Sequence, residues 1–162
     1  MRGMIRAAAG LVVGGVAVFA GTQATQDNTV RDENGAIVES GGLGAFAMQV
    51  GDCFNDPGAD ATQVQSVEGV PCTEPHDNEV FAEFDVEHAS FPGEQEVFEE
   101  GWERCLTYFD AYVGTPYEDS ILDIGAFSPS VGSWGEGDRE ITCYVYHLQG
   151  QKLTVTARSS GL

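Results

Sequence analysis

The chain has 162 residues, 42% of them hydrophobic and 10% aromatic, which is enough apolar material for one packed domain with a short appendage. Its formal net charge of −19 is unevenly placed: the first 26 residues carry two arginines and no acid, whereas the rest carries 26 acidic residues against five basic ones, a balance of −21. A body this acidic is repelled by nucleic acid and by anionic lipid surfaces, so neither is an expected partner. The charge favours solubility, with cation binding as the alternative.

The first segment combines a cationic start with an apolar run. Arg2 and Arg6 precede an uncharged stretch from Ala7 to Ala24 that is rich in Gly and Ala and lacks the polar face of a soluble helix. The secretion machinery recognises this pattern, and the length is at the lower limit of about 17–20 residues for spanning a bilayer. We therefore predict that residues 1–24 are a cleaved signal peptide or a retained anchor, with residues 5–24 as the tether. Both place the acidic body outside the cytoplasm, either membrane-anchored or secreted.

A polar segment separates this head from the domain. Residues 25–45 are rich in Gly, Asn, Asp, Gln, Ser and Thr, and we predict a linker. The pair Asn34-Gly35 favours a tight turn, so a loose two-stranded hairpin is expected within it. From residue 46 the apolar pattern tightens, which predicts a domain over residues 46–158 and a short tail at residues 159–162.

Three strands are predicted in the first half of the domain. Apolar residues alternate from Phe46 to Val50 and lead to Cys53, and Val64, Val67 and Val70 indicate a second, less regular strand. The pattern is strongest over residues 79–87. It predicts a strand with Val80, Ala82, Phe84 and Val86 on one face and Glu79, Phe81, Glu83, Asp85 and Glu87 on the other.

The clearest helix follows. It is predicted to begin at Pro92-Gly93, with Glu94 and Glu96 in the first turn where the helix dipole favours negative charge, and to end at Gly114. Its apolar residues recur at three- and four-residue steps: Val97, Phe98, Trp102, Cys105, Leu106, Phe109, Tyr112 and Val113.

The last third of the chain is predicted to be irregular and then extended. Residues 115–138 show no regular pattern, whereas residues 141–146 and 153–158 alternate as strands around the turn at Gln149-Gly150. The expected fold is α+β: a small antiparallel sheet of about five strands with one main helix packed on a face, disulfide-linked and preceded by the N-terminal hydrophobic segment.

Four cysteines fit an oxidising compartment. Cys53, Cys72, Cys105 and Cys143 form no Cys-x-x-Cys pair, so neither a zinc knuckle nor a thioredoxin-like motif is indicated. The first two end neighbouring predicted strands, whereas Cys105 lies on the buried stripe of the helix and Cys143 faces the core. This placement favours Cys53–Cys72 and Cys105–Cys143, although spacing alone allows the other pairings. Each bridge would contribute roughly 2–4 kcal/mol.

The best polar cluster is His76, Asp77 and Glu79, with Glu74 beside it. A histidine flanked by carboxylates is a candidate for metal binding or general base catalysis. Adjacent residues on a proline-led turn rarely converge on one ion, so no metal is assigned. The favoured interpretation is that Asp77 caps a turn and His76 packs against a strand end. The cluster is kept as a candidate binding surface.

A second candidate surface comprises Trp134, Asp138 and Arg139. The structural interpretation places Trp134 in a satellite core, with Asp138 bonding turn amides and Arg139 pairing with a carboxylate. The functional one is an interface built from an aromatic residue and an arginine. No nucleophile or metalloprotease motif occurs, so no catalytic residue and no cofactor is assigned. Glycan hydrolysis by two carboxylates stays open, but the chain is so acidic that no particular pair is indicated.

Several short motifs occur in one order along residues 46–158. They are Val50-Gly51-Asp52-Cys53-Phe54, Val70-Pro71-Cys72-Thr73-Glu74-Pro75-His76-Asp77-Asn78-Glu79-Val80, Phe91-Pro92-Gly93-Glu94, Cys105, Tyr112-Val113-Gly114, Pro129, Trp134-x-x-Gly137-Asp138-Arg139 and Cys143. Together they resemble the septum-formation domain family of actinobacterial envelope proteins. The resemblance implies a domain tethered to or secreted across the membrane and linked to division-septum formation, with no established enzymatic activity.

Three functions are therefore open to test. The preferred one is a non-catalytic cell-envelope module that contacts an envelope or divisome protein or a cell-wall component. The alternatives are a wall glycan hydrolase that uses Asp or Glu, and a metal-responsive module centred on His76, Asp77 and Glu79.

Overall fold

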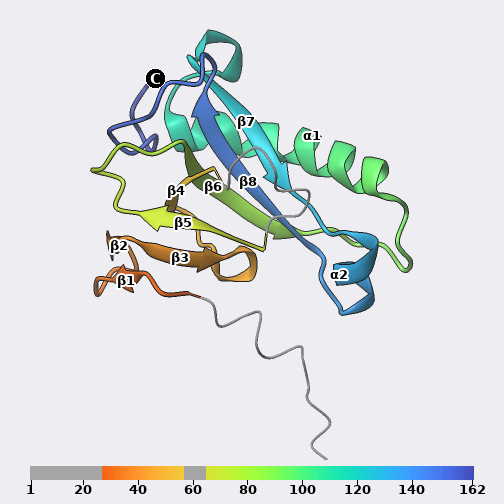
Figure 1. Ribbon diagram of the computed structural model, residues 1–162. Coiled ribbons are helices and arrows are strands. Elements are labelled where there is room, and N and C mark those ends of the chain that lie inside the picture. The colour runs from red at the N-terminus through yellow and green to blue at the C-terminus, as the bar shows by residue number, and fades with distance from the viewer. Residues whose placement is uncertain (1–26, 57–64) are drawn as a thin grey trace, which may run out of the picture.

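The computed structural model describes residues 27–56 and 65–162, which form an α+β domain as predicted (Figure 1). Within them, a six-stranded antiparallel sheet has the order β3-β5-β4-β6-β8-β7, and β1 and β2 pair separately as a hairpin. The strands are β1 (Val30–Arg31), β2 (Ile37–Glu39), β3 (Gly41–Gly44), β4 (Cys53–Asn55), β5 (Ser66–Val70), β6 (Asn78–Asp85), β7 (Leu122–Phe127) and β8 (Glu140–His147). The predicted signal peptide or anchor lies outside the described residues.

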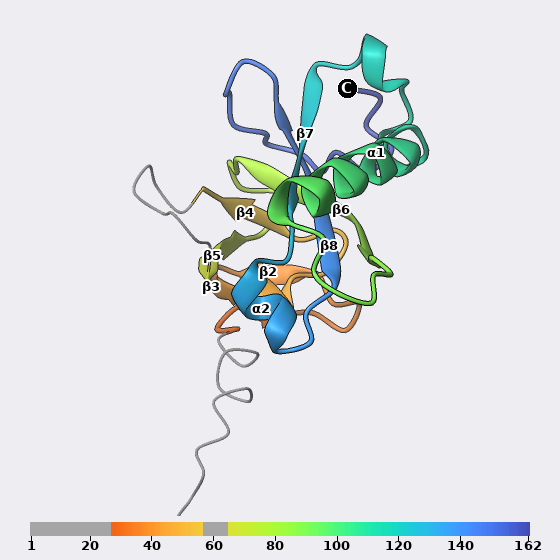
Figure 2. The ribbon, with the colours of Figure 1, turned by 90° about the vertical axis from the view of Figure 1, so that its right-hand side faces the viewer.

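The predicted helix is confirmed as α1 (Glu94–Val113), which packs on one face of the sheet against β6, β7 and β8 (Figure 2). Gly114 ends it with a left-handed conformation (φ 88°), which a residue without a Cβ adopts readily. Most of its predicted apolar stripe is buried or half-buried, but Phe98 is 39% exposed, and the opposite face is charged. In the described chain, no helix is both long and apolar enough to cross a membrane.

Two hydrophobic cores lie on opposite sides of the central strands. The helix-side core is formed by α1 with residues of β6, β7 and β8, and it includes Phe81, Phe109 and Ile141. The hairpin-side core lies beneath the β1-β2 hairpin and contains Ile37, Leu43, Met48, Phe54, Val67 and Val80. The sheet is therefore buried on both faces near its middle, which explains why its central strands carry apolar residues at consecutive positions.

A bulge in β6 changes which side chains face the helix. Val80 pairs with Tyr144 of β8, but the next pair is Ala82 with Cys143, so Phe81 is the extra residue. Because side chains alternate along a strand, one inserted residue exchanges the two faces from that point on.

This exchange corrects the predicted face pattern of the strand. Glu79 does not share a solvent face with Glu83; it points toward α1, whereas Val80 lies in the hairpin-side core. After the bulge, Ala82 and Val86 face the helix-side core as predicted. The strict alternation predicted for residues 79–87 is therefore wrong at Glu79 and Val80, and it places the buried carboxylate of Glu79 on the wrong face of the strand.

The segment predicted to be irregular contains regular structure. β7 pairs along its full length with β8, and the short helix α2 (Val131–Gly135) follows it. The strand is hard to recognise because it includes Gly125. The ring of Tyr144 lies over that glycine, and a Cβ there would come within 2.3 Å of the ring. An aromatic ring from the neighbouring strand thus fills the space of the missing side chain.

Two other predicted strands are wrong. Residues near Phe46 form a 3-10 turn, η2 (Ala45–Ala47), rather than a strand. At the other end of the chain, only Leu153 makes a β-bridge, to His76, and Val155 is 53% exposed. Both segments have an alternating pattern but, within the described residues, no continuous partner strand to satisfy their backbone groups.

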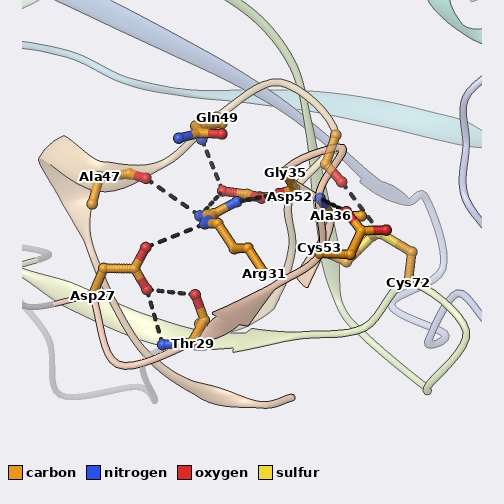
Figure 3. Close-up of polar contacts among 12 residues, drawn as sticks. Asp27, Thr29, Arg31, Gly35, Ala36, Ala47, Gln49, Asp52, Cys53 and Cys72 are labelled. Atoms are coloured by element: carbon orange, nitrogen blue, oxygen red, sulfur yellow. Dashed lines mark hydrogen bonds and ion pairs between the residues drawn. A yellow bond between two sulfur atoms is a disulfide. The ribbon is translucent and has the colours of Figure 1, made fainter. Parts of the chain in front are cut away.

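The polar segment before residue 46 is folded from Asp27 onward. The hairpin predicted at Asn34-Gly35 is present as β1 and β2, and β3 joins the edge of the main sheet. Arg31 and Asp52 explain why this polar segment stays on the domain. The arginine donates two hydrogen bonds, of 2.6 and 2.8 Å, to the two carboxylate oxygens of Asp52, which is 2% exposed (Figure 3).

Replacing Arg31 by alanine should lower the free energy of unfolding by about 3 kcal/mol, because the buried Asp52 carboxylate would lose its cation. Urea denaturation measures the loss, and hydrogen exchange should show faster exchange in β1, β2 and β3. Arg31→Lys is the matched control, since it keeps the charge but not the paired geometry and should lose less. Equal stability of wild type and Arg31→Ala would contradict this assignment.

Candidate functional site

Both disulfides form in the favoured pairs, Cys53–Cys72 and Cys105–Cys143. The first joins the start of β4 to the turn that follows β5, and Figure 3 shows it close to Asp52. The second fixes the middle of α1 to β8 in the helix-side core. All four cysteines are therefore structural in the oxidised chain.

His76 lies in the turn that leads into β6, and its side chain is 0% exposed. Its backbone exchanges two hydrogen bonds with Leu153, which draws the C-terminal segment over the turn. The ring Nδ1 lies 2.7 Å from the carbonyl oxygen of Glu74, and a carbonyl only accepts, so Nδ1 carries the hydrogen. Nε2 is buried and has no hydrogen-bond partner among the described residues.

Glu79 is also 0% exposed, and three donors hold its carboxylate. Oε1 accepts hydrogen bonds from the hydroxyls of Tyr112 (2.6 Å) and Thr156 (2.7 Å), while Oε2 accepts one from the backbone amide of Ala157 (2.6 Å). These donors come from α1 and from the C-terminal segment, so one carboxylate connects three parts of the chain. Burial and the adjacent carboxylate raise the pKa of Tyr112 above its usual value.

Asp77 does not lie with His76 and Glu79, the other two residues of the predicted cluster. It points outward, where it accepts hydrogen bonds from Lys152 (2.7 Å) and from the amide of Asp56 (3.1 Å). Partial burial opposes ionisation, but Lys152 and the amide outweigh it and hold the pKa of Asp77 below its usual value. The predicted cluster is therefore split: His76, in the turn before β6, and Glu79, in β6, point inward, whereas Asp77 lies toward the surface with Lys152.

The structure adds a sulfur to the inward pair. One ligand-type atom from each of Cys53, His76 and Glu79 lies within 4.8 Å of the other two, and all three residues are buried. Tyr112 and Thr156 complete the surroundings through their bonds to Glu79. None of these additions could be read from spacing, because the bulge that turns Glu79 inward leaves no mark in the apolar pattern.

The second candidate surface is a packed structural unit. Trp134 is buried against Phe91, with ring centroids 5.4 Å apart, and the guanidinium of Arg139 lies 3.7 Å from the Trp134 ring centroid. Asp138 accepts from the amide of Glu140, so its predicted role in bonding turn amides is confirmed. The predicted ion pair of Arg139 is wrong for the described residues: its guanidinium donates to the carbonyls of Trp134 and Asp138.

Glu83 and Glu140 are two half-buried acids whose pKa values are raised. Burial, together with the nearby charges of Glu140 and Asp52, raises the pKa of Glu83 to about 7. Burial also raises the pKa of Glu140. Paired carboxyls with raised pKa values are typical of acid–base sites. Neither residue lines the pocket formed by Asp77, Phe98 and Tyr144 or the one formed by Gln49, Asp52 and Arg158.

The raised pKa of Glu83 predicts a pH-dependent stability. Folded chains hold this proton more tightly than unfolded ones, so the stabilisation is complete below the unfolded pKa near 4.5 and is lost as the pH rises through about 7. Glu83→Gln should therefore be more stable than wild type at pH 8 by about 1–2 kcal/mol, a modest figure because solvent partly screens the group. Thermal melts at pH 4.5 and pH 8 test this, with the two proteins expected to converge at the lower pH.

A pocket of about 410 Å³ opens beside β7, the edge strand of the sheet. Four aromatic side chains and two carboxylates contribute to its lining: Phe98, Trp102, Tyr144, Tyr146, Asp56 and Asp77. Aromatic faces combined with carboxylates provide both stacking and hydrogen-bonding surfaces. Asp77 is the member of the predicted cluster that reaches this pocket, from the opposite side of the turn to His76 and Glu79.

Comparison with known proteins identifies one family. The model of the family described as "Septum formation" matches residues 50–161, from the turn before β4 to the C-terminal segment. No curated protein and no solved structure matches the chain. The match spans both disulfides, the His76–Glu79 strand entry and the Trp134–Arg139 unit. The chain therefore belongs to the septum-formation family.

Proposed function

We propose that this protein is a non-catalytic extracytoplasmic module that acts in division-septum formation by contacting another component of the envelope. The observation that carries the proposal is the family match over residues 50–161. The two disulfides support the placement, since such bonds persist in oxidising compartments. The N-terminal apolar segment supports export as a secreted or membrane-anchored protein.

The charge distribution supports a cationic partner. All five basic residues of the body make contacts inside the described fold: Arg31 with Asp52, Lys152 with Asp77, Arg104 over Phe84, Arg139 over Trp134 and Arg158 over Tyr112. Since 26 acidic residues of the body face only these five basic ones, the surface offered to a partner is dominated by carboxylates. A basic segment of an envelope or divisome protein complements it in charge, and electrostatic attraction would raise its rate of association.

The pocket beside β7 is the contact surface that we assign to this role. Phe98 is 39% exposed at its rim, and the carboxylates of Asp56 and Asp77 lie in its lining. An apolar rim with nearby carboxylates suits a segment that carries both an apolar and a basic side chain. A wall component that offers amines alongside apolar carbon surface is the alternative ligand.

Localisation in dividing cells tests the proposal. A fluorescent fusion of the full chain should concentrate at the septum, and a strain lacking the chain should show abnormal septa. Phe98→Ser should reduce this concentration, whereas Tyr108→Ser should not, because Tyr108 is equally exposed (40%) on the same helix but does not line the pocket. An even distribution around the cell together with normal septa in the deletion strain would reject the proposal.

Glycan hydrolysis receives less support from the site. The carboxyls with raised pKa values, Glu83 and Glu140, do not line the pocket, and Asp77 inside it is held ionised by Lys152. A general acid needs a proton to donate near neutral pH. Purified protein is expected to release no fragments from peptidoglycan or arabinogalactan across a pH series, and release of fragments would favour the enzyme instead.

A further inference from the structure

Three side chains that ligate metals in proteins meet beside the Cys53–Cys72 disulfide. The Cys53 sulfur lies 3.6 Å from Glu79 Oε2, and ligand atoms of Cys53, His76 and Glu79 are all within 4.8 Å of one another. Cys72 Sγ is bonded to Cys53 Sγ and lies 3.3 Å from the carbonyl oxygen of Gly51, so it adjoins the group and can join it only after the disulfide is broken. In a tetrahedral zinc site with bonds of about 2.0–2.3 Å, neighbouring ligand atoms are about 3.3–3.8 Å apart. The 3.6 Å between Cys53 Sγ and Glu79 Oε2 meets that requirement, and the two sulfurs would have to move apart once their bond is broken.

The orientation of His76 is that of a metal ligand. Its Nδ1 donates to the Glu74 carbonyl, which fixes the ring and directs Nε2 into the buried interior. Metal-ligating histidines almost always donate their other ring nitrogen to a carbonyl or carboxylate in this way. Nε2 is one of two buried side-chain atoms in the described chain that lack a hydrogen-bond partner. A buried acceptor without a donor costs stability, so a ligand for Nε2 would remove that cost.

Hydrogen bonds orient the Glu79 carboxylate and leave one of its oxygens able to bind a metal. Tyr112 and Thr156 both donate to Oε1, so the carboxylate is oriented without using all the capacity of Oε2. Oε2 accepts one hydrogen bond, from the amide of Ala157, and a carboxylate oxygen can accept two. The oxygen nearest the Cys53 sulfur is therefore the one with capacity left.

We propose that Cys53, Cys72, His76 and Glu79 bind one Zn²⁺ when the disulfide is reduced. A dithiol reductant gives up two electrons and two protons, becomes a disulfide itself and leaves Cys53 and Cys72 as thiols. Zn²⁺ then displaces both thiol protons to solvent and is held by two thiolates, His76 Nε2 and Glu79 Oε2. A disulfide oxidant reverses the exchange: it takes two electrons, the Cys53–Cys72 bond re-forms and Zn²⁺ is released.

The other disulfide provides an internal comparison. Cys105 and Cys143 are as buried as Cys53, but they belong to no group of three or more metal-ligating side chains in the described part of the chain. Their surroundings are the apolar helix-side core. Zinc binding is therefore assigned to one disulfide alone.

Cobalt titration of the full chain tests the site. After reduction by a phosphine, the protein should take up one Co²⁺ per chain with a thiolate-to-metal charge-transfer band, and Zn²⁺ should displace it. The oxidised protein and the Cys53→Ala/Cys72→Ala double variant should take up none. Cys105→Ala/Cys143→Ala should retain the band. His76→Gln and Glu79→Gln should each weaken binding at least tenfold, and Tyr112→Phe, which removes only a supporting bond, about tenfold.

Stability gives a second measurement that does not depend on the reduced chain staying folded. Saturating Zn²⁺ should raise the melting temperature of the reduced protein by at least about 5 °C and leave that of the oxidised protein unchanged. If reduction alone unfolds the chain, Zn²⁺ should restore the helical circular dichroism. A reduced protein that binds no metal and shows no recovery overturns the proposal. Equal binding by wild type, His76→Gln and Glu79→Gln does so too, since the thiols alone would then be responsible.

Discussion

Glu79→Ala should lower the free energy of unfolding by about 3–5 kcal/mol, the largest effect expected from a single substitution in this chain. The side chain is fully buried and accepts from Tyr112, Thr156 and Ala157. Its removal would leave the Tyr112 hydroxyl and the buried amide of Ala157 without their acceptor and would remove the side-chain link between the C-terminal segment and α1. Urea denaturation of the purified oxidised protein measures the loss.

Two further variants make this prediction specific. Glu79→Gln keeps the shape but replaces one acceptor oxygen by a donor that faces the amide of Ala157, so we expect a smaller loss of about 1–3 kcal/mol. Glu83→Gln, four residues along the same strand, should be stabilising at pH 8. If Glu79→Ala changed stability by no more than Glu83→Gln does, the buried carboxylate would not have the structural role assigned to it.

Removal of the Cys105–Cys143 disulfide, by alanine at both positions, should cost about 4 kcal/mol. The bond closes a loop with a sequence separation of 38, whereas Cys53–Cys72 closes one of 19, for which the same chain-entropy relation gives about 3 kcal/mol. The helix would also lose the only disulfide that links it to the sheet among the described residues, so loosened packing adds to the entropic loss.

The two double-alanine variants are matched controls for each other. Each variant removes one disulfide and keeps the other. Denaturation should show the lower midpoint for the variant that lacks Cys105–Cys143. Hydrogen exchange should show increased opening of α1 when the bond at Cys105 is removed, and of β4 with the following turn when the bond at Cys53 is removed. The opposite order of stability would show that strain or residual unfolded structure outweighs loop length.

The sequence was sufficient for features whose pattern is local. The helix could be located because its start, stripe and glycine stop all lie within one segment, and the disulfide pairs followed from the faces on which the cysteines lie. β7 was not predicted, because its Gly125 is compatible with a strand only when Tyr144 of the neighbouring strand covers it. The hairpin was predicted, but its packing on the domain was not, because that packing depends on the contact between Arg31 and Asp52, which are distant in the sequence.

The candidate site was predicted in composition but not in arrangement. His76 and Glu79 belong together, but with Cys53 in place of Asp77. Cys53 joins them because β4 pairs with β6 and places Cys53 opposite Glu79, and the pairing of two strands cannot be read from the residues of one. The partners of Glu79 were equally inaccessible, because Thr156 and Ala157 lie in a segment whose alternation predicted a regular strand.

The contact of Arg31 with Asp52 also determines how the domain would respond to mechanical force. If the chain ahead of Asp27 is held at the membrane and the pocket beside β7 is held by a partner, tension enters at one edge of the sheet and leaves at the other. The first hydrogen bonds to be loaded are those of the hairpin and β3, with the Arg31–Asp52 pair as their clamp. Beyond β3, the bond between Cys53 and Cys72 ties β4 to the end of β5 covalently. A pull would therefore peel the N-terminal edge first, extend the link by a few nanometres of chain, and leave the rest of the sheet intact.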